Sequence, residues 1–374
     1  MSKTAAWTAP DPSGRRAILP DSSLENSKDR TVVVTGASGL LGSRVALKLI
    51  RAGYTVRCFQ RRNAVAVRES LQPKGLERFE QHRGSITHPD HVSRALDGAD
   101  AVVHLAAKVS VTGPWEEYVE TNVTGTRILL EGARAEGIGR FVQVSSPSVS
   151  HAGSAFMGQG NQPADPDNAR GNYARSKAYA ERLALDYDSQ DLLVGVVRPH
   201  LVWGPGDTQL VERVIERASR GGIPLLDAGA ALIDSTYVDN AAEAVLRDFE
   251  RLETVHGKPL VISNGEPRTV GELMTMMCEA AGVQPPQRTV PASVAKLAGS
   301  VVEKIWARRP GADEPPMTRF LAEQLSTSHW FDQRETHELL DWKPEVSIDE
   351  GMESLRRYYR PRSSENTASL RPLV

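Results

Sequence analysis

Cysteine is scarce in this sequence, and its scarcity excludes two kinds of structure. The 374 residues include only Cys58 and Cys278, too few for a disulfide framework or a cysteine-based metal cluster. None of the nine histidines lies in a ligand-like spacing such as HExxH, so we expect no metal site. We interpret both cysteines as small buried apolar residues in a reducing compartment.

Long apolar runs and an excess of charge are also missing. No stretch approaches the roughly 18 apolar residues that a membrane-spanning helix needs. Residues 1–30 lack the apolar run of a signal peptide. A formal net charge of −2 provides no basic field for nucleic acid. We therefore expect a cytoplasmic protein that binds no nucleic acid.

Short strand-like runs alternate with helical patterns through the first half of the chain. The expected strands are 31–35, 54–59, 101–105, 141–144 and 193–197, and helix-like segments are 39–52, 91–96 and 123–136. Because strands and helices alternate at this spacing, we expect an α/β fold: a Rossmann-type doubly wound parallel sheet with helices on both faces.

After about Pro199 the pattern becomes mainly helical. The helical segments are 210–220, 240–253, 270–281 and 291–309. They predict a smaller, mainly helical C-terminal substrate region packed against the sheet. The predicted organisation is a disordered extension at 1–30, a dinucleotide-binding core at 31–198, a substrate-binding region interleaved with that core at 199–360, and a tail at 361–374.

A glycine-rich segment joins the first expected strand to the first expected helix. Gly36, Gly39 and Gly42 form the spacing GxxGxxG. Glycines let the backbone approach a pyrophosphate, and the helix N-terminus offers N–H groups and a positive dipole end to it. We therefore expect a dinucleotide here; the alternative is a tight turn with close helix–strand packing.

The end of the second expected strand predicts which dinucleotide is bound. NAD-preferring folds usually place an acidic residue there, and NADP-preferring folds place arginine. This sequence has Gln60, Arg61 and Arg62 and no carboxylate. We expect NADP(H) to be preferred and NAD(H) to be a weaker possibility, with a solvated basic strand end as the alternative interpretation.

Tyr173 and Lys177 are four residues apart in a segment with a helical pattern, which would place them on one face. A lysine ammonium beside a tyrosine favours the phenolate, so we expect it to lower the tyrosine pKa. Ser145 and Ser146 follow the expected strand 141–144, where a hydroxyl can bind a substrate oxygen. An isolated serine there would more often cap a turn.

Several motifs together resemble the extended short-chain dehydrogenases/reductases. They are TGASGLLG, HLAA from His104, NVTGT from Asn122, VSS, YARSK and Arg198-Pro199, within a resemblance that spans about residues 31–358. RPHLVWGPGD resembles the 3β-hydroxysteroid dehydrogenase branch. VSSPSVSHAGS and PPMTRFLAEQLSTSHWFD look most like bacterial reductases of 2-alkyl-3-oxoalkanoic acids in olefin synthesis.

The resemblance implies roles for individual residues. Tyr173 would be the proton donor or acceptor, Lys177 would tune it and hold the ribose, and Ser146 would polarise the carbonyl. Asn122 would support the lysine through a water or a helix kink. The implied cofactor-binding residues are Gly36, Ser38, Gly39, Leu40, Leu41, Arg61, Arg62, Ser85, Ile86, Leu105, Ala106, Ala107, Tyr173, Lys177, Pro199 and Leu201. Ser85 departs from the family, which usually has aspartate there.

The implied function is NADP(H)-dependent interconversion of a ketone and a secondary alcohol on a hydrophobic substrate, with a long-chain 2-alkyl-3-oxo acid as the first expectation. The alternatives are a 3β-hydroxysteroid dehydrogenase, a sugar-nucleotide epimerase or dehydratase, and a non-catalytic dinucleotide-binding protein. A homodimer is also expected. Segment 291–309 mixes apolar and basic residues, which is typical of a helix packed on the substrate region or of peripheral contact with a membrane or an enzyme partner.

Overall fold

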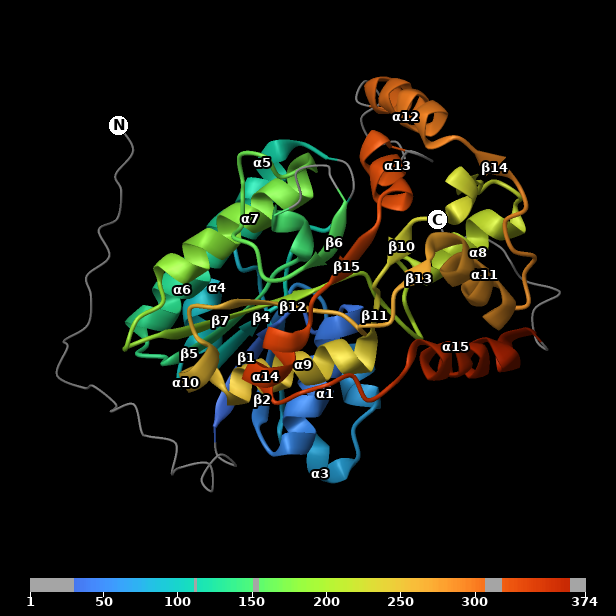
Figure 1. Ribbon diagram of the computed structural model, residues 1–374. Helices are drawn as coiled ribbons and strands as arrows, with labels where there is room; N and C mark the ends of the chain where they lie inside the picture. Colours follow the sequence, from blue (N-terminus) through green and yellow to red (C-terminus); the bar gives the residue numbers. More distant parts are fainter. Residues whose placement is uncertain (1–29, 111–112, 151–154, 307–317, 364–374) are drawn as a thin grey trace.

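A computed structural model describes residues 30–110, 113–150, 155–306 and 318–363 (Figure 1). Its centre is a seven-stranded sheet in the order β12-β7-β5-β4-β1-β2-β3. All pairings in it are parallel. The strands are β1 (Thr31–Thr35), β2 (Thr55–Gln60), β3 (Phe79–Arg83), β4 (Ala101–His104), β5 (Arg140–Val144), β7 (Leu193–Pro199) and β12 (Pro259–Ile262).

Two apolar cores lie on opposite faces of this sheet. The first joins alternate strand residues to α1 (Leu40–Ala52), α2 (Val65–Glu69), α9 (Val238–Glu250), α10 (Leu252–Val255) and α14 (Arg334–Leu340). The second joins the other strand residues to α4 (Pro89–Leu96), α6 (Gly125–Ala135) and α7 (Gly171–Asp186). Strands buried on both faces read as continuous apolar runs, as in Val32, Val33 and Val34 of β1. The expected Rossmann-type doubly wound fold is confirmed.

A smaller, mainly helical part packs beside the sheet, on the right in Figure 1. Its helices are α8 (Val211–Ser219), α11 (Val270–Ala280), α12 (Ala292–Trp306), α13 (Arg319–Ser326) and α15 (Ile348–Ser363). A four-stranded sheet in the order β13-β10-β15-β6 belongs to it, from β13 (Arg268–Thr269), β10 (Leu232–Ile233), β15 (His329–Phe331) and β6 (Phe156–Gln159). Two parallel pairs complete it: β8 (Val202–Trp203) with β11 (Thr236–Tyr237), and β9 (Leu225–Leu226) with β14 (Thr289–Val290).

The structure departs from the expected elements in two places. Residues 259–262 form β12, the edge strand beside β7, in a stretch where no strand was expected. The segment expected as one helix at 123–136 is divided, because a π-helical turn η3 (Val119–Thr124) precedes α6. Short helices fill some connections: α3 (Pro73–Leu76), α5 (Trp115–Tyr118), η4 (Pro147–Ser150) and η5 (Asp227–Gly229).

The predicted extension at 1–30 lies outside the described residues except for Arg30, and the predicted tail lies outside them from residue 364. Across the four described ranges, no helix combines the length and hydropathy that crossing a bilayer requires.

Candidate active site

The glycine-rich loop forms a cradle at the carboxyl end of β1. Gly36 has φ +74°, and a Cβ there would lie 2.9 Å from the backbone nitrogen of Ala106. A Cβ on Gly42 would lie 2.3 Å from the carbonyl oxygen of Gly36, so no larger side chain fits. Gly39 is the N-cap of α1 and provides no side-chain cap, which leaves the first N–H groups of the helix, at Leu40 and Leu41, for an anion.

Gln60 links this loop to the end of β2. The backbone N–H of Ser38 donates to Gln60 Oε1 at 2.9 Å, which fixes the orientation of the amide. Gln60 Nε2 is then a buried donor without a hydrogen-bond partner among the described residues. A buried donor costs free energy unless something accepts from it. Its place beside the loop suits an acceptor on the adenosine ribose of a bound dinucleotide.

Arg61 and Arg62 follow Gln60, and both side chains are exposed. Neither makes an ion pair with another residue of the described chain, so both guanidinium groups are available to an anionic ligand. The cradle, the buried amide donor and these two cations fit a nicotinamide dinucleotide.

The other predicted cofactor residues follow β3 and β4. Leu105 and Ala106 donate their N–H groups to Thr35 Oγ1 at 3.1 and 3.0 Å, which holds the chain after β4 against the loop. Ile86 is buried against Gly125. The Ser85 hydroxyl lies 2.9 Å from the Thr87 hydroxyl. Ala107 is half-buried.

Tyr173 and Ser146 meet at the carboxyl end of β5. Tyr173 lies in the first turn of α7, and the Ser146 side chain is near enough to its hydroxyl to favour the phenolate. The Ser146 hydroxyl is also 3.0 Å from that of Ser148. Ser145 Oγ, in contrast, is buried without a partner among the described residues. The pair of hydroxyls suits a carbonyl oxygen, which can accept from both.

Lys177 lies one turn further along α7 and is almost fully buried, with 4% of its surface exposed. Its Nζ donates to the carbonyl oxygen of Val144 at 2.6 Å. Burial lowers the pKa of Lys177 to about 8, while the Glu181 carboxylate acts in the opposite direction.

The expected lowering of the tyrosine pKa is wrong for the described residues. Burial of the hydroxyl raises the pKa of Tyr173 to about 12, and the nearby Ser146 side chain opposes the rise only in part. The Lys177 ammonium donates to the backbone carbonyl of Val144, so burial determines the direction in which the Tyr173 pKa shifts. At neutral pH this phenol is protonated and ready to donate, which suits reduction of a ketone.

Asn122 lies in the π-helical turn η3 and is buried. Its side chain accepts from Lys108 N at 2.7 Å and donates to Ser176 Oγ at 2.9 Å. It is therefore hydrogen-bonded to the residue that precedes Lys177. Pro199 ends β7 in the core, whereas Leu201 is 38% exposed with φ +41°.

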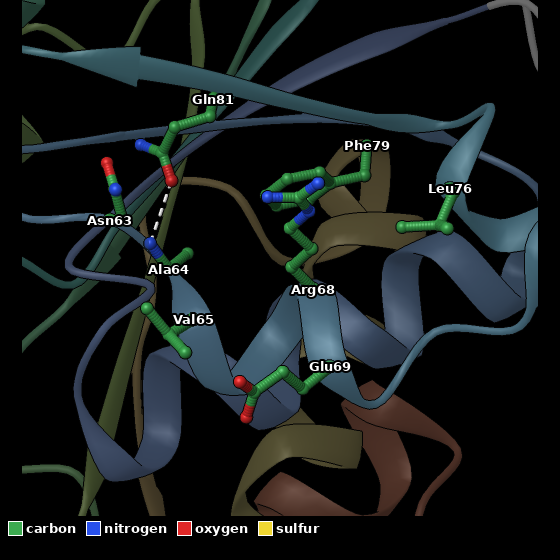
Figure 2. Close-up of a pocket in the computed structure, with 8 residues that line it drawn as sticks. All are labelled: Asn63, Ala64, Val65, Arg68, Glu69, Leu76, Phe79 and Gln81. Atoms are coloured by element: carbon green, nitrogen blue, oxygen red, sulfur yellow. Dashed lines mark hydrogen bonds between the residues drawn. The ribbon is translucent and has the colours of Figure 1, made fainter.

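An open pocket of about 560 Å³ lies between α2 and the edge strand β3 (Figure 2). Its lining residues are Asn63, Ala64, Val65, Arg68, Glu69, Leu76, Phe79 and Gln81. None of the predicted site residues lines it, so it is not the catalytic cleft.

Sequence reasoning missed two features of this site. Gln60 was noted only for its lack of charge, although its strand-end position could have identified it. Glu181 and Arg198 form an ion pair with both side chains fully buried. The position of Glu181, four residues after Lys177, was the available signal.

A family model described as NAD dependent epimerase/dehydratase family matches residues 32–263. The 2-alkyl-3-oxoalkanoate reductase of Stenotrophomonas maltophilia (strain K279a) is 37% identical over 331 residues, which cover 87% of this chain and 98% of that protein. The 3 beta-hydroxysteroid dehydrogenase/Delta 5-->4-isomerase of Mycobacterium tuberculosis (strain ATCC 25618 / H37Rv) is 27% identical, over 91% of this chain and 93% of that protein.

A solved structure, MoeE5 in complex with UDP-glucose and NAD, superposes with a TM-score of 0.66 at 25% sequence identity, over 89% of this chain and 99% of that chain. The family match and the similarity to reductases and dehydrogenases agree with a dinucleotide cradle beside a Tyr–Ser–Lys constellation. The chain belongs to the NAD-dependent epimerase/dehydratase family, within the extended short-chain dehydrogenases/reductases, and is an NAD(P)-dependent oxidoreductase.

Proposed function

We propose that this protein is an NADPH-dependent reductase of long-chain 2-alkyl-3-oxo acids. The observation that carries the proposal is the placement of the Tyr173 and Ser146 hydroxyls beside each other, where both can donate to one ketone oxygen. Similarity to the Stenotrophomonas maltophilia reductase supports the substrate class.

Each site residue has a distinct part in this reaction. Bound NADPH would supply the hydride. Ser146 donates a hydrogen bond to the ketone oxygen and stabilises the negative charge that develops on it. Tyr173 donates its proton to that oxygen, and the raised pKa keeps the proton available at neutral pH. Lys177 presents a buried ammonium at the same edge of the sheet.

Exposed apolar side chains support a hydrophobic substrate. Val109 follows β4 and Leu201 follows β7, with 54% and 38% of their surfaces exposed. Met157 of β6 and Leu232 of β10 are 63% and 38% exposed. Ligands of parallel α/β sheets bind beyond the carboxyl ends of the strands. Apolar side chains left in solvent near that edge suit a fatty chain.

The substrate class predicts a dependence on chain length. Each methylene that enters an apolar site contributes about 0.8 kcal/mol, so kcat/KM should rise about threefold or more per methylene until the site is full. We would measure kcat/KM with NADPH across 2-alkyl-3-oxo acids of increasing length. A Met157→Ser variant should flatten the rise, and Val65→Ser, an exposed apolar position in the α2 pocket, is the control. A length-independent kcat/KM contradicts the proposed substrate class.

We also propose that NADPH is preferred over NADH. Gln60 offers a donor where NAD-preferring folds offer a carboxylate, and Arg61 and Arg62 follow it. In Gln60→Glu the carboxylate still accepts from Ser38 N–H but repels a 2′-phosphate. Hydrogen bonds to charged groups are worth about 1.5–3 kcal/mol, so the ratio of NADPH to NADH affinity should fall at least about tenfold.

The dissociation constants of both cofactors, measured by nicotinamide fluorescence, test this preference. Arg61→Ala should lower the same ratio, whereas Arg51→Ala, an exposed arginine in the last turn of α1, should not. Equal affinity of the wild type for NADH and NADPH overturns the preference.

We propose peripheral contact between α12 and anionic membranes. Val294, Leu297 and Val301 are 54%, 72% and 52% exposed, and their spacing places them on one helix face. Segment 291–309 carries Lys296, Lys304, Arg308 and Arg309 against the single acid Glu303, a balance that suits anionic headgroups.

Flotation with anionic liposomes at low salt tests this contact. The wild type should float and Leu297→Asp should not. A wild-type protein that does not float with the liposomes contradicts the proposed membrane contact.

A homodimer also stays a prediction, and sedimentation of the purified protein would measure its oligomeric state.

A further inference from the structure

A buried ion pair joins the catalytic helix to the strand that ends at Pro199. Arg198 of β7 donates from Nε to Glu181 Oε2 at 2.9 Å, and from Nη2 to the other carboxylate oxygen. Both side chains are fully buried. Arg198 Nη1 also donates to the carbonyl oxygen of Gln162 at 2.5 Å. Glu181 lies four residues after Lys177 and eight after Tyr173, so all three share one face of α7.

A buried ion pair of this kind contributes little net stability to the folded state. Removing two charges from water costs about as much as their attraction returns, and apolar replacements are often as stable. A fully buried pair beside a catalytic helix therefore calls for a role other than stabilisation. Its nearest ionisable neighbour along the helix face is Lys177, which is itself buried.

We propose that the Glu181–Arg198 pair is a positioning device for Lys177: Arg198 holds the Glu181 carboxylate in place, and that carboxylate favours and aligns the Lys177 ammonium. The inference rests on the proposed function and on the ribose-binding role that the family resemblance implies for Lys177. Neither Glu181 nor Arg198 touches the reacting atoms in this account.

The surroundings of Lys177 support this assignment. Burial lowers its pKa to about 8, and Glu181 is the one carboxylate of the described chain that raises it. On the same helix, Tyr173 is neutral because burial raises its pKa to about 12. From β4, His104 is neutral because burial and the Lys177 charge lower its pKa to about 3. Arg198 of β7 is paired with Glu181.

The test is the pH dependence of NADPH affinity. In the wild type, the affinity should weaken as pH rises through about 8, because the lysine loses its proton there. Glu181→Gln keeps the side-chain shape and removes the charge that favours the ammonium. The midpoint of the alkaline loss should then move down by at least about one pH unit. Arg198→Lys keeps the cation, so its midpoint should stay near the wild-type value.

A second variant keeps the test decisive if Glu181→Gln does not fold. The double variant Glu181→Gln/Arg198→Met removes both charges of the pair, so neither partner is left buried and unpaired, and it should fold more readily than Glu181→Gln. It also lacks the carboxylate, so its midpoint should move down as well. Glu253→Gln is the matched control, because it breaks an ion pair with Arg140 near the amino end of β5, away from Lys177.

Dissociation constants for NADPH from pH 6 to 9.5 give the result by nicotinamide fluorescence, with far-UV circular dichroism as the folding check. A folded Glu181→Gln or double variant with the wild-type midpoint overturns the inference, as does an equal shift in Glu253→Gln. The measurement needs no ketone, so a wild type that binds NADPH but reduces no 2-alkyl-3-oxo acid contradicts only the proposed function.

Discussion

Tyr173→Phe should lower the turnover of the ketone by at least about 10²-fold, the usual contribution of general acid catalysis. The change removes one oxygen and keeps the ring, so the fold and the packing of α7 should be unchanged. It removes the proton donor and the partner of Ser146. NADPH affinity should change little, because Lys177 and the glycine cradle are untouched. Single-turnover rates with saturating NADPH would measure the loss.

Tyr179→Phe is the matched control for this prediction. Tyr179 lies on the same helix and packs against Trp115, with the ring centroids 6.3 Å apart. Its hydroxyl has no part in the proposed reaction, so turnover should stay within about twofold of the wild type, as for most substitutions outside the machinery. A Tyr173→Phe variant with near-normal turnover means that another group donates the proton.

Asp248→Asn should remove a pH-dependent contribution of several kcal/mol to the free energy of unfolding between about pH 4 and 8. Asp248 of α9 packs against β7 at Gly195, where a Cβ would lie 2.1 Å from its Oδ2. Both carboxylate oxygens are buried without partners among the described residues. Burial raises the pKa of Asp248 to about 8, and Arg140 opposes the rise only in part.

The sign follows from proton linkage. The folded state holds the Asp248 proton up to about pH 8, whereas the unfolded chain releases it near the ordinary value of 3.8. The contribution of the Asp248 proton to the free energy of unfolding is therefore complete below about pH 4. It is lost as pH rises toward 8, with a slope of up to about 1.4 kcal/mol per pH unit. Asparagine mimics the protonated form at every pH, so the variant should lose this slope.

Urea unfolding of the wild type and Asp248→Asn from pH 5 to 9 would measure the two slopes. The variant should be the more stable protein at pH 8. Asp97→Asn, at an exposed position after α4, controls for loss of one negative charge. Parallel stability curves for the wild type and Asp248→Asn contradict the prediction.

Strong local patterns made much of the fold predictable. The run TVVVT could be assigned to a buried strand, and the apolar spacing from Leu41 to Ile50 to a helix on it. Strand β12 was missed because its four residues lie in a mainly helical stretch, and periodicity alone cannot distinguish so short a run. The π-helical turn at Asn122 has no periodic signal of its own.

The site was predictable where chemistry follows spacing along the chain. Tyr173 and Lys177 are one helical turn apart, and the three glycines of the loop are contiguous with the helix they open. Features that depend on tertiary contacts were not predictable. The orientation of the Gln60 amide, which leaves Nε2 as a donor, depends on the hydrogen bond from Ser38 N–H. The high pKa of Tyr173 results from burial, which no local pattern measures.

The reaction proposed for this protein is a net transfer of hydride from free NADPH to a ketone. Sugar-nucleotide epimerases of the same fold class would return the hydride within one turnover and consume no cofactor. The most direct measurement follows NADPH oxidation with a long-chain 2-alkyl-3-oxo acid, with a 3-oxosteroid and a UDP-sugar alongside. We expect one NADPH to be consumed per hydroxy acid formed and no reaction with the UDP-sugar. Conversion of the UDP-sugar without NADPH consumption, together with no reduction of the oxo acid, would contradict it.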